Sequence, residues 1–349
     1  ITHPSPLNGA FFIHMPKLEK HLLRRVYMDI LRGFSKVYDT SYGDFYIKHV
    51  DNFDSEEIDE KGEEYKNHAI KQGLPSTKEK LEQLKQDESW TDEEERKISD
   101  LEKMISNLKI TKSKVLLKAQ IDQLQEQIED TEKELQKLRF EKAGLVGYTS
   151  DIYATKKINE YYVLKTSYKD KELTKPLFEI DQFEDLQEKD ITLLIKYYND
   201  VSEKNGEDNI KRIALSGFFL NNFYLCEDNP RIYYGKPVMN LTYNQCELFS
   251  YGKYFKHILS EMKNKPHPEV MDDPDKLIEL YNVGQNADKM KQSMENADAS
   301  TVVGATSEDL ERMGIKGPSD EPQKGVSLAK EAAKKGGNLS MEDLMKLHS

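Results

Sequence analysis

The sequence predicts a mainly α-helical protein, with a compact helical body, an inserted coiled-coil arm and an extended C-terminal tail. Three observations favour this class. Only 37% of the 349 residues are hydrophobic and 33% are charged, whereas cores covered on both faces come from chains that are ~45–50% apolar. The 18 Gly and 12 Pro are few for this length, which disfavours folds built from many tight turns. Apolar residues also recur at helical spacing along most of the chain.

Residues 1–74 are predicted to form an N-terminal arm and the first helices of the body. Pro4, Pro6 and Pro16 favour an extended start, because proline cannot sit inside a helix without loss of a hydrogen bond. From Leu18 the apolar residues step by four and predict a helix. Residues 38–50 are aromatic and partly β-branched, and they fit a short strand, a hairpin or a helix start. The change from acidic to basic side chains predicts a further helix over residues 54–72.

The first of these helices carries the most basic face in the chain. A solvated face is the favoured interpretation, and an acidic partner or a nucleic acid is the alternative. The residues of this face are Lys17, Lys20, Arg24, Arg25 and Arg32.

Residues 75–147 are predicted to form the coiled-coil arm. Ser76 with Glu79, and Thr91 with Glu94, have the spacing of capping boxes at helix starts. Two heptad seams follow. Their residues are Ile98, Leu101, Ile105 and Leu108, then Leu117, Ile121, Leu124, Ile128, Leu135 and Leu138.

The two seams do not share a register, and the interruption lies near residues 109–114. Either the helix turns back here as an antiparallel hairpin, or one long helix carries a phase shift. The absence of Gly and Pro between Ser76 and Ala143 favours the long helix. The β-branched and Ser-containing sequence KITKSK favours a turn, and we prefer the hairpin.

Residues 148–285 are predicted to form an aromatic-rich helical body. We expect Asp190 to cap one helix, and Asp208 or Asn209 to cap a central apolar helix that runs to Cys226. Thr242 and Gln245 form a third capping box. Asp273, followed by Pro274, is expected to open the last substantial helix.

Residues 286–349 are predicted to form an extended, partner-binding tail, because apolar residues become scarce beyond Gly284. Three short amphipathic pieces within it are too short to persist alone in water. We therefore expect them to bind neighbouring subunits. Their candidate contact residues are Leu310, Met313, Leu328, Leu339, Leu344 and Leu347.

Tyrosine is unusually frequent, with 19 Tyr against one Trp. Most are expected to be half-buried core residues, including Tyr243, Tyr251 and Tyr254. Tyr233 and Tyr234 lie in a sequence typical of a turn. An interface role for these two is as well supported as a core role.

No motif in the sequence indicates catalysis. The eight His form no helical metal pair, and signatures of phosphate-binding loops and nucleophile elbows are missing. We therefore expect a non-enzymatic protein with no metal and no cofactor. The net charge of −12 argues against a dedicated duplex-binding surface. Two Cys do not make a disulfide framework, and neither a membrane span nor a secretory signal is expected.

Residues 212–259 read RIALSGFFLNNFYLCEDNPRIYYGKPVMNLTYNQCELFSYGKYFKHIL. This stretch, with the Lys-, Asn-, Asp- and Tyr-rich sequence around it, resembles virion structural and tail-assembly proteins of large tailed bacteriophages. The resemblance implies a structural or assembly component located in the virion or, during assembly, in the host cytoplasm. Its partners would be other protein subunits of a particle, with self-association through the coiled coil as a further possibility. The alternative is an intracellular adaptor or regulator that binds host or viral machinery through the coiled coil.

Overall fold

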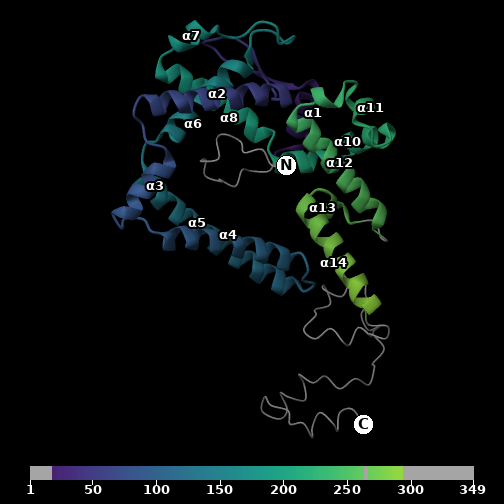
Figure 1. The fold of residues 1–349 in the computed structure, drawn as a ribbon. Helices are drawn as coiled ribbons and strands as arrows, with labels where there is room; N and C mark the ends of the chain where they lie inside the picture. Colours follow the sequence, from purple (N-terminus) through teal and green to yellow (C-terminus); the bar gives the residue numbers. More distant parts are fainter. Residues whose placement is uncertain (1–17, 263–265, 294–349) are drawn as a thin grey trace, which may run out of the picture. The chain divides into compact units, whose positions relative to one another are not determined.

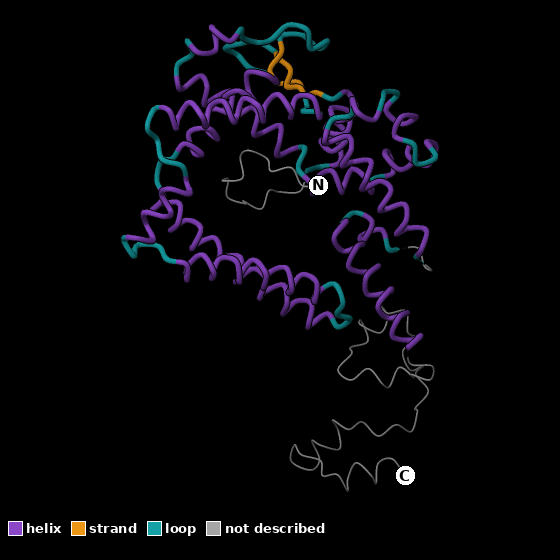
Figure 2. Tube along the Cα trace, in the orientation of Figure 1, coloured by secondary structure: helices purple, strands orange, loops and turns teal. Residues whose placement is uncertain are grey.

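The computed structural model describes residues 18–262 and 266–293, and they are mainly helical, as predicted (Figures 1 and 2). The chain divides into two compact units. Among the described residues, one comprises residues 18–113, 123–262 and 266–282, and the other comprises residues 114–122 and 283–293. The N-terminal arm and the predicted tail contacts Leu310, Met313, Leu328, Leu339, Leu344 and Leu347 lie outside the described residues.

The larger unit contains an aromatic core built from helices at both ends of the sequence. Its main helices are α1 (Lys20–Arg32), α9 (Glu207–Leu215), α10 (Gly217–Phe223), α12 (Tyr243–Glu261) and the first turns of α14 (Pro274–Ser293). Their fully buried side chains include Ile30, Ile210, Phe219, Phe223, Phe255 and Leu277. Gly252 allows the close approach of α10, because a Cβ there would lie 2.7 Å from the Phe219 ring. We call this part of the unit the aromatic lobe.

Short elements complete the aromatic lobe. They are η1 (Tyr224–Cys226), α11 (Pro230–Tyr234), η2 (Val238–Asn240) and α13 (Pro268–Met271).

Three expectations for the helices of the body were wrong in detail. The central apolar helix is not continuous, because Ser216 adopts an extended conformation and separates α9 from α10. The Ser216 hydroxyl donates a hydrogen bond to the carbonyl of Ile213, one of the carbonyls at the end of α9 that lack a partner within the helix. Asp208 and Asn209 do not cap α9, since the cap position is Gly206. Likewise, Asp190 lies in the first turn of α8 (Glu188–Lys204), whose cap position is Gln187.

The rest of the body packs around a small antiparallel sheet with the order β1-β2-β3. Its strands are β1 (Phe34–Val37), β2 (Phe45–Lys48) and β3 (Ser167–Tyr168). Residues 38–50 therefore contain one short strand, β2, and the turn before it. The hairpin also needs β1, which precedes this range and places Val37 opposite Phe45. Asp39 stabilises the turn by accepting the backbone N–H groups of Ser41 and Tyr42.

Four helices accompany this sheet, and we call the group the sheet lobe. They are α2 (Asn52–Lys71), α6 (Ser150–Thr166), α7 (Ile180–Glu184) and α8 (Glu188–Lys204). Phe45 and Ile47 of β2 meet Val163 of α6 and Leu194 of α8 in its core. Gly62 brings α2 close to α6, because a Cβ at this position would lie 2.6 Å from Ile158.

The arm is an antiparallel helical hairpin rather than one long helix. After α3 (Thr77–Gln86), α4 (Asp92–Lys112) ends at the interruption and α5 (Lys118–Val146) returns along it. The cross-helix contacts run in opposite directions along the two helices: Glu95 meets Lys142, Glu102 meets Arg139, and Lys112 meets Gln125. Ser113 and Thr111 bond to backbone carbonyls of α4, a local competition with the helix that favours its end here.

The smaller unit includes the residues between α4 and α5 and the second half of α14. Ile121 is buried with Val283 and Ala287, and Val115 and Leu116 pack beside them. Helix α14 therefore continues beyond residue 286, where the tail was predicted to begin, to Ser293.

Candidate protein interface

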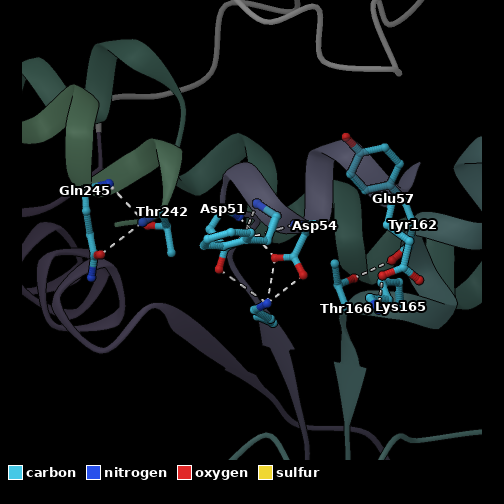
Figure 3. A network of polar contacts seen from close by, with 10 residues as sticks. Asp51, Asp54, Glu57, Tyr162, Lys165, Thr166, Thr242 and Gln245 are labelled. Carbon is cyan, nitrogen blue, oxygen red and sulfur yellow. Dashed lines mark hydrogen bonds and ion pairs between the residues drawn. The ribbon is translucent and has the colours of Figure 1, made fainter. Parts of the chain in front are cut away.

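A buried polar junction connects the two lobes and fixes α1, α2 and α12 relative to one another (Figure 3). The Gln245 side chain on α12 donates to the backbone carbonyl of Ile30, at the end of α1, over 2.8 Å. At the start of α12, Thr242 and Gln245 form the predicted capping box. The backbone N–H of Tyr243 donates to the carbonyl of Val50, just before α2.

The start of α2 is held by a half-buried ion cluster. Asp51 caps the helix by accepting the N–H groups of Phe53 and Asp54. Lys48 from β2 lies 2.6 Å from the Asp54 carboxylate and 3.6 Å from that of Asp51. Because Asp54 is also buried, this pair anchors α2 to the sheet at a defined rotation about its axis.

His49 belongs to the same junction, and its buried side chain has a structural role. Its Nε2 lies 2.9 Å from the Ser35 hydroxyl and 3.2 Å from the Asn205 amide nitrogen. Burial, reinforced by the positive charge of Lys236, lowers the pKa of His49 to about 3. The imidazole is therefore neutral at physiological pH and ties the sheet to the end of α8.

Further along α2, one ion pair and one hydrogen bond hold the helix against α6. Glu57 accepts hydrogen bonds from the Tyr161 hydroxyl and from Lys165, each over 2.6 Å. Burial, together with the bond to Glu57, raises the pKa of Tyr161 above its usual range. These contacts occupy the side of α2 that faces α6 and leave its other side in solvent.

The aromatic lobe exposes large apolar side chains along one short segment, residues 224–239. We call this segment the apolar rim. Its exposed fractions range from 47% for Tyr224 to 79% for Leu225. Five large apolar side chains with this exposure within 16 residues make the segment a candidate interaction surface. The exposed apolar residues of the rim are Tyr224, Leu225, Ile232, Val238 and Met239.

The backbone of the apolar rim is also unusual. Glu227 and Asp228 are consecutive and both left-handed, with φ of 52° and 57°. Non-glycine residues adopt this conformation only where the surrounding structure imposes it, and such strain concentrates at functional sites. Here Asp228 pairs with Lys256 of α12 over 2.8 Å, which ties the turn to the lobe.

Tyr233 and Tyr234, the two predicted interface aromatics, are packed inward beneath the rim. The Tyr233 hydroxyl lies 2.5 Å from that of Tyr27, and the Tyr234 hydroxyl donates to the carbonyl of Gln245. Both rings contact Phe249, and burial raises the pKa of both hydroxyls. This geometry favours the core alternative for these two residues. The exposed neighbours Leu225 and Ile232, which no sequence pattern indicated, occupy the surface instead.

The predicted seam residues separate into two groups. Ile98, Leu101, Ile105, Ile128 and Leu135 are buried between α4 and α5, with Leu108 and Leu138 packed beside them. Ile121 is buried in the smaller unit instead. Leu117 and Leu124 are only half-buried. The first group thus meets within one chain, and the outer side of the hairpin carries different apolar residues, chiefly Met104, Ile110 and Phe140.

Within the described residues, no group of three or more His, Cys, Asp or Glu side chains is arranged to hold a metal ion. In the same part of the chain, none of the helices has the length and apolar character required to cross a membrane. No protein-family model, curated protein or solved structure matches this chain.

Proposed function

We propose that this chain is a non-enzymatic structural or assembly component of a tailed phage particle, which binds neighbouring subunits through exposed surfaces on a rigid helical body. The observation that carries this proposal is the apolar rim. Burying such side chains against a partner stabilises the complex by ~25 cal/mol per Å² of apolar surface removed from water. The entropy lost when the two proteins associate and their side chains become ordered opposes this gain. Residues 212–259 include the rim and resemble virion structural and tail-assembly proteins of large tailed bacteriophages. This resemblance supports a tailed phage particle as the assembly.

The hairpin supports the same proposal in a second way. Because α4 and α5 bury their seam against each other, a partner would meet the outer face of the arm. Phe140 is 79% exposed on α5 and Ile110 is 50% exposed on α4. A rigid arm with apolar contacts directed outward suits a component that reaches toward a neighbouring subunit.

Replacing two rim residues with acids tests the proposal. We expect Leu225→Asp with Ile232→Asp to lower the amount of chain that sediments with particles at least ~10-fold, because a carboxylate in an apolar contact loses its hydration. The matched control is Ile152→Asp on α6, which is 40% exposed. Particles that take up the rim variant as well as the control would contradict the proposal.

A further inference from the structure

The cationic face of α1 has an ordered geometry that suits carboxylate recognition. Lys20, Arg24, Arg25 and Arg32 are all exposed on this helix, and Met28 among them is 39% exposed. Arg32 lies 3.7 Å from Asp29. The other three cations have no carboxylate within 4 Å in the described part of the chain.

Two of these guanidinium groups are held in place by aromatic rings. Arg24 lies over the Phe218 ring at 5.3 Å, and Arg25 lies over the Tyr38 ring at 5.5 Å. Lys36 lies over the same Tyr38 ring at 4.5 Å. Stacking fixes the plane of a guanidinium while leaving its N–H edge free, and that edge matches the two oxygens of a carboxylate.

The solvent side of α2 carries the complementary charge. Glu56, Glu60 and Glu63 are exposed and follow one another by four and three residues, so they lie on one face of the helix. None of the three has a cationic partner within 4 Å in the described residues. The same spacing continues to Phe53 at one end and Ile70 at the other, and these are 55% and 45% exposed.

The three glutamates extend along a little more than half the length of the cationic face. Lys20 to Arg32 spans about 18 Å of helix, and the three glutamates span about 10 Å with the apolar ends beyond them, at ~1.5 Å rise per residue. The polar junction and the Glu57 contacts fix the rotation of α2, so that its acidic face is presented to solvent. Both faces are therefore ready for contact without rearrangement.

We propose that the cationic face of α1 in one copy binds the acidic face of α2 in a second copy. Because the two faces are different, a pair of copies still has one free acidic face, on the first copy, and one free cationic face, on the second. Such a heterologous contact continues into a chain or a ring. The inference rests on the proposed function in one respect, namely that a particle component is expected to repeat.

A nucleic acid is the other polyanion that α1 could meet. It would approach a chain of net charge −12, which opposes its binding over distances up to the Debye length of ~10 Å. A second copy carries the same net charge, but it offers carboxylates in a stripe that matches the cationic face. The chain's own charge pattern therefore favours the second copy.

Two complementary variants test the contact. Variant one carries Arg24→Gln and Arg25→Gln, and variant two carries Glu56→Gln and Glu60→Gln. Each variant lacks one face and keeps the other, so a mixture of the two can form a single contact and no more. Sedimentation equilibrium of the full chain at about 100 µM and ~0.1 M salt measures the masses, since a contact of this size is expected to be weak.

We expect the wild-type chain to show species larger than a dimer, and each variant alone to associate at least ~10-fold more weakly. The equimolar mixture should recover association to within ~3-fold of the wild type and stop at the dimer. The control variant, Lys137→Gln with Lys189→Gln, neutralises two exposed cations elsewhere and should behave as the wild type. Circular dichroism checks that each variant is folded.

A wild-type chain that stays monomeric, or a mixture that stays monomeric, overturns the proposal. A DNA duplex that binds the wild type and not variant one, without self-association, assigns α1 to nucleic acid and also overturns it. These results are separate from the proposed function. A monomeric chain that is present in purified particles refutes only the contact between copies.

Discussion

Asp29 on α1 provides a stability prediction whose sign follows directly from its surroundings. The side chain is 17% exposed, and burial raises its pKa from 3.8 to about 6, even though Arg25, Arg32 and Lys204 act in the opposite direction. Above pH 6 the folded protein therefore holds a carboxylate that is less favourable there than in the unfolded chain. Replacing Asp29 with Asn removes this charge and should stabilise the fold.

The magnitude follows from the change in pKa. A difference of about two units corresponds to about 3 kcal/mol at most, at ~1.4 kcal/mol per unit. Because the group retains some contact with solvent, we expect Asp29→Asn to gain about 1–3 kcal/mol at pH 8. The folded state binds this proton more tightly than the unfolded state, so protonation stabilises the wild type fully below pH 3.8, and that contribution is lost as the pH rises through about 6.

Urea unfolding of both proteins at pH 8, 6 and 4.5 measures the effect. Comparing the two proteins at each pH is essential, because acids such as Asp151 act with the opposite sign. Although burial opposes it, hydrogen bonds from Lys66 and Thr77 lower the pKa of Asp151 to about 2. The advantage of Asp29→Asn should shrink as the pH falls from 8 to 4.5. An advantage that is absent at pH 8, or that stays constant with pH, would refute the reasoning.

Three further predictions concern packing and the tail. Gly252→Ala should destabilise the protein by ~1–3 kcal/mol despite its better helix propensity, because the new methyl group meets the buried Phe219 ring; thermal unfolding measures this, and an unchanged Tm contradicts it. Ile128→Ala should cost ~2–5 kcal/mol in urea unfolding, whereas Phe140→Ala on the outer face of α5 should change stability by less than ~0.5 kcal/mol; equal effects would contradict the hairpin packing. Truncation after Ser293 should abolish assembly into particles while circular dichroism of the helical body is retained, and normal assembly of the truncated chain excludes a role for the tail.

The elements that could be predicted from the sequence are those specified by local chemistry. Ser76, Thr91 and Thr242 each form the predicted capping box, because both partners of such a box lie within one turn. The hydrophobic seams predicted α4 and α5 for a similar reason. Their relative direction stayed open, since residues 109–114 contain signals both for a helix and for its end.

Elements that depend on distant contacts were missed. Residues 34–37 are too short to show strand periodicity, and they become β1 only through pairing with β2. The break at Ser216 was missed because its apolar neighbours continue the helical pattern on both sides. The break at Ser216 places Phe219 in the aromatic core. This packing depends on distant residues, so the local sequence pattern does not indicate it.

The candidate surfaces were only partly predictable from the sequence. The basic face of α1 could be identified from spacing, but the rings under Arg24 and Arg25 come from Phe218 and Tyr38 and required the fold. Tyr233 and Tyr234 were predicted as equally suited to core and interface. Their hydroxyl partners, Tyr27 and the carbonyl of Gln245, are distant in sequence or on another helix and favour the core.

The most direct test of the central claim is the copy number of this chain in purified particles from its source, measured by mass spectrometry against isotope-labelled peptides. A structural component of a symmetric particle is expected in a fixed multiple relative to the major subunit, reproducible between preparations and retained through a density gradient. A chain that is absent from the particles, or present in amounts that vary between preparations, would contradict the proposal that it is a structural component.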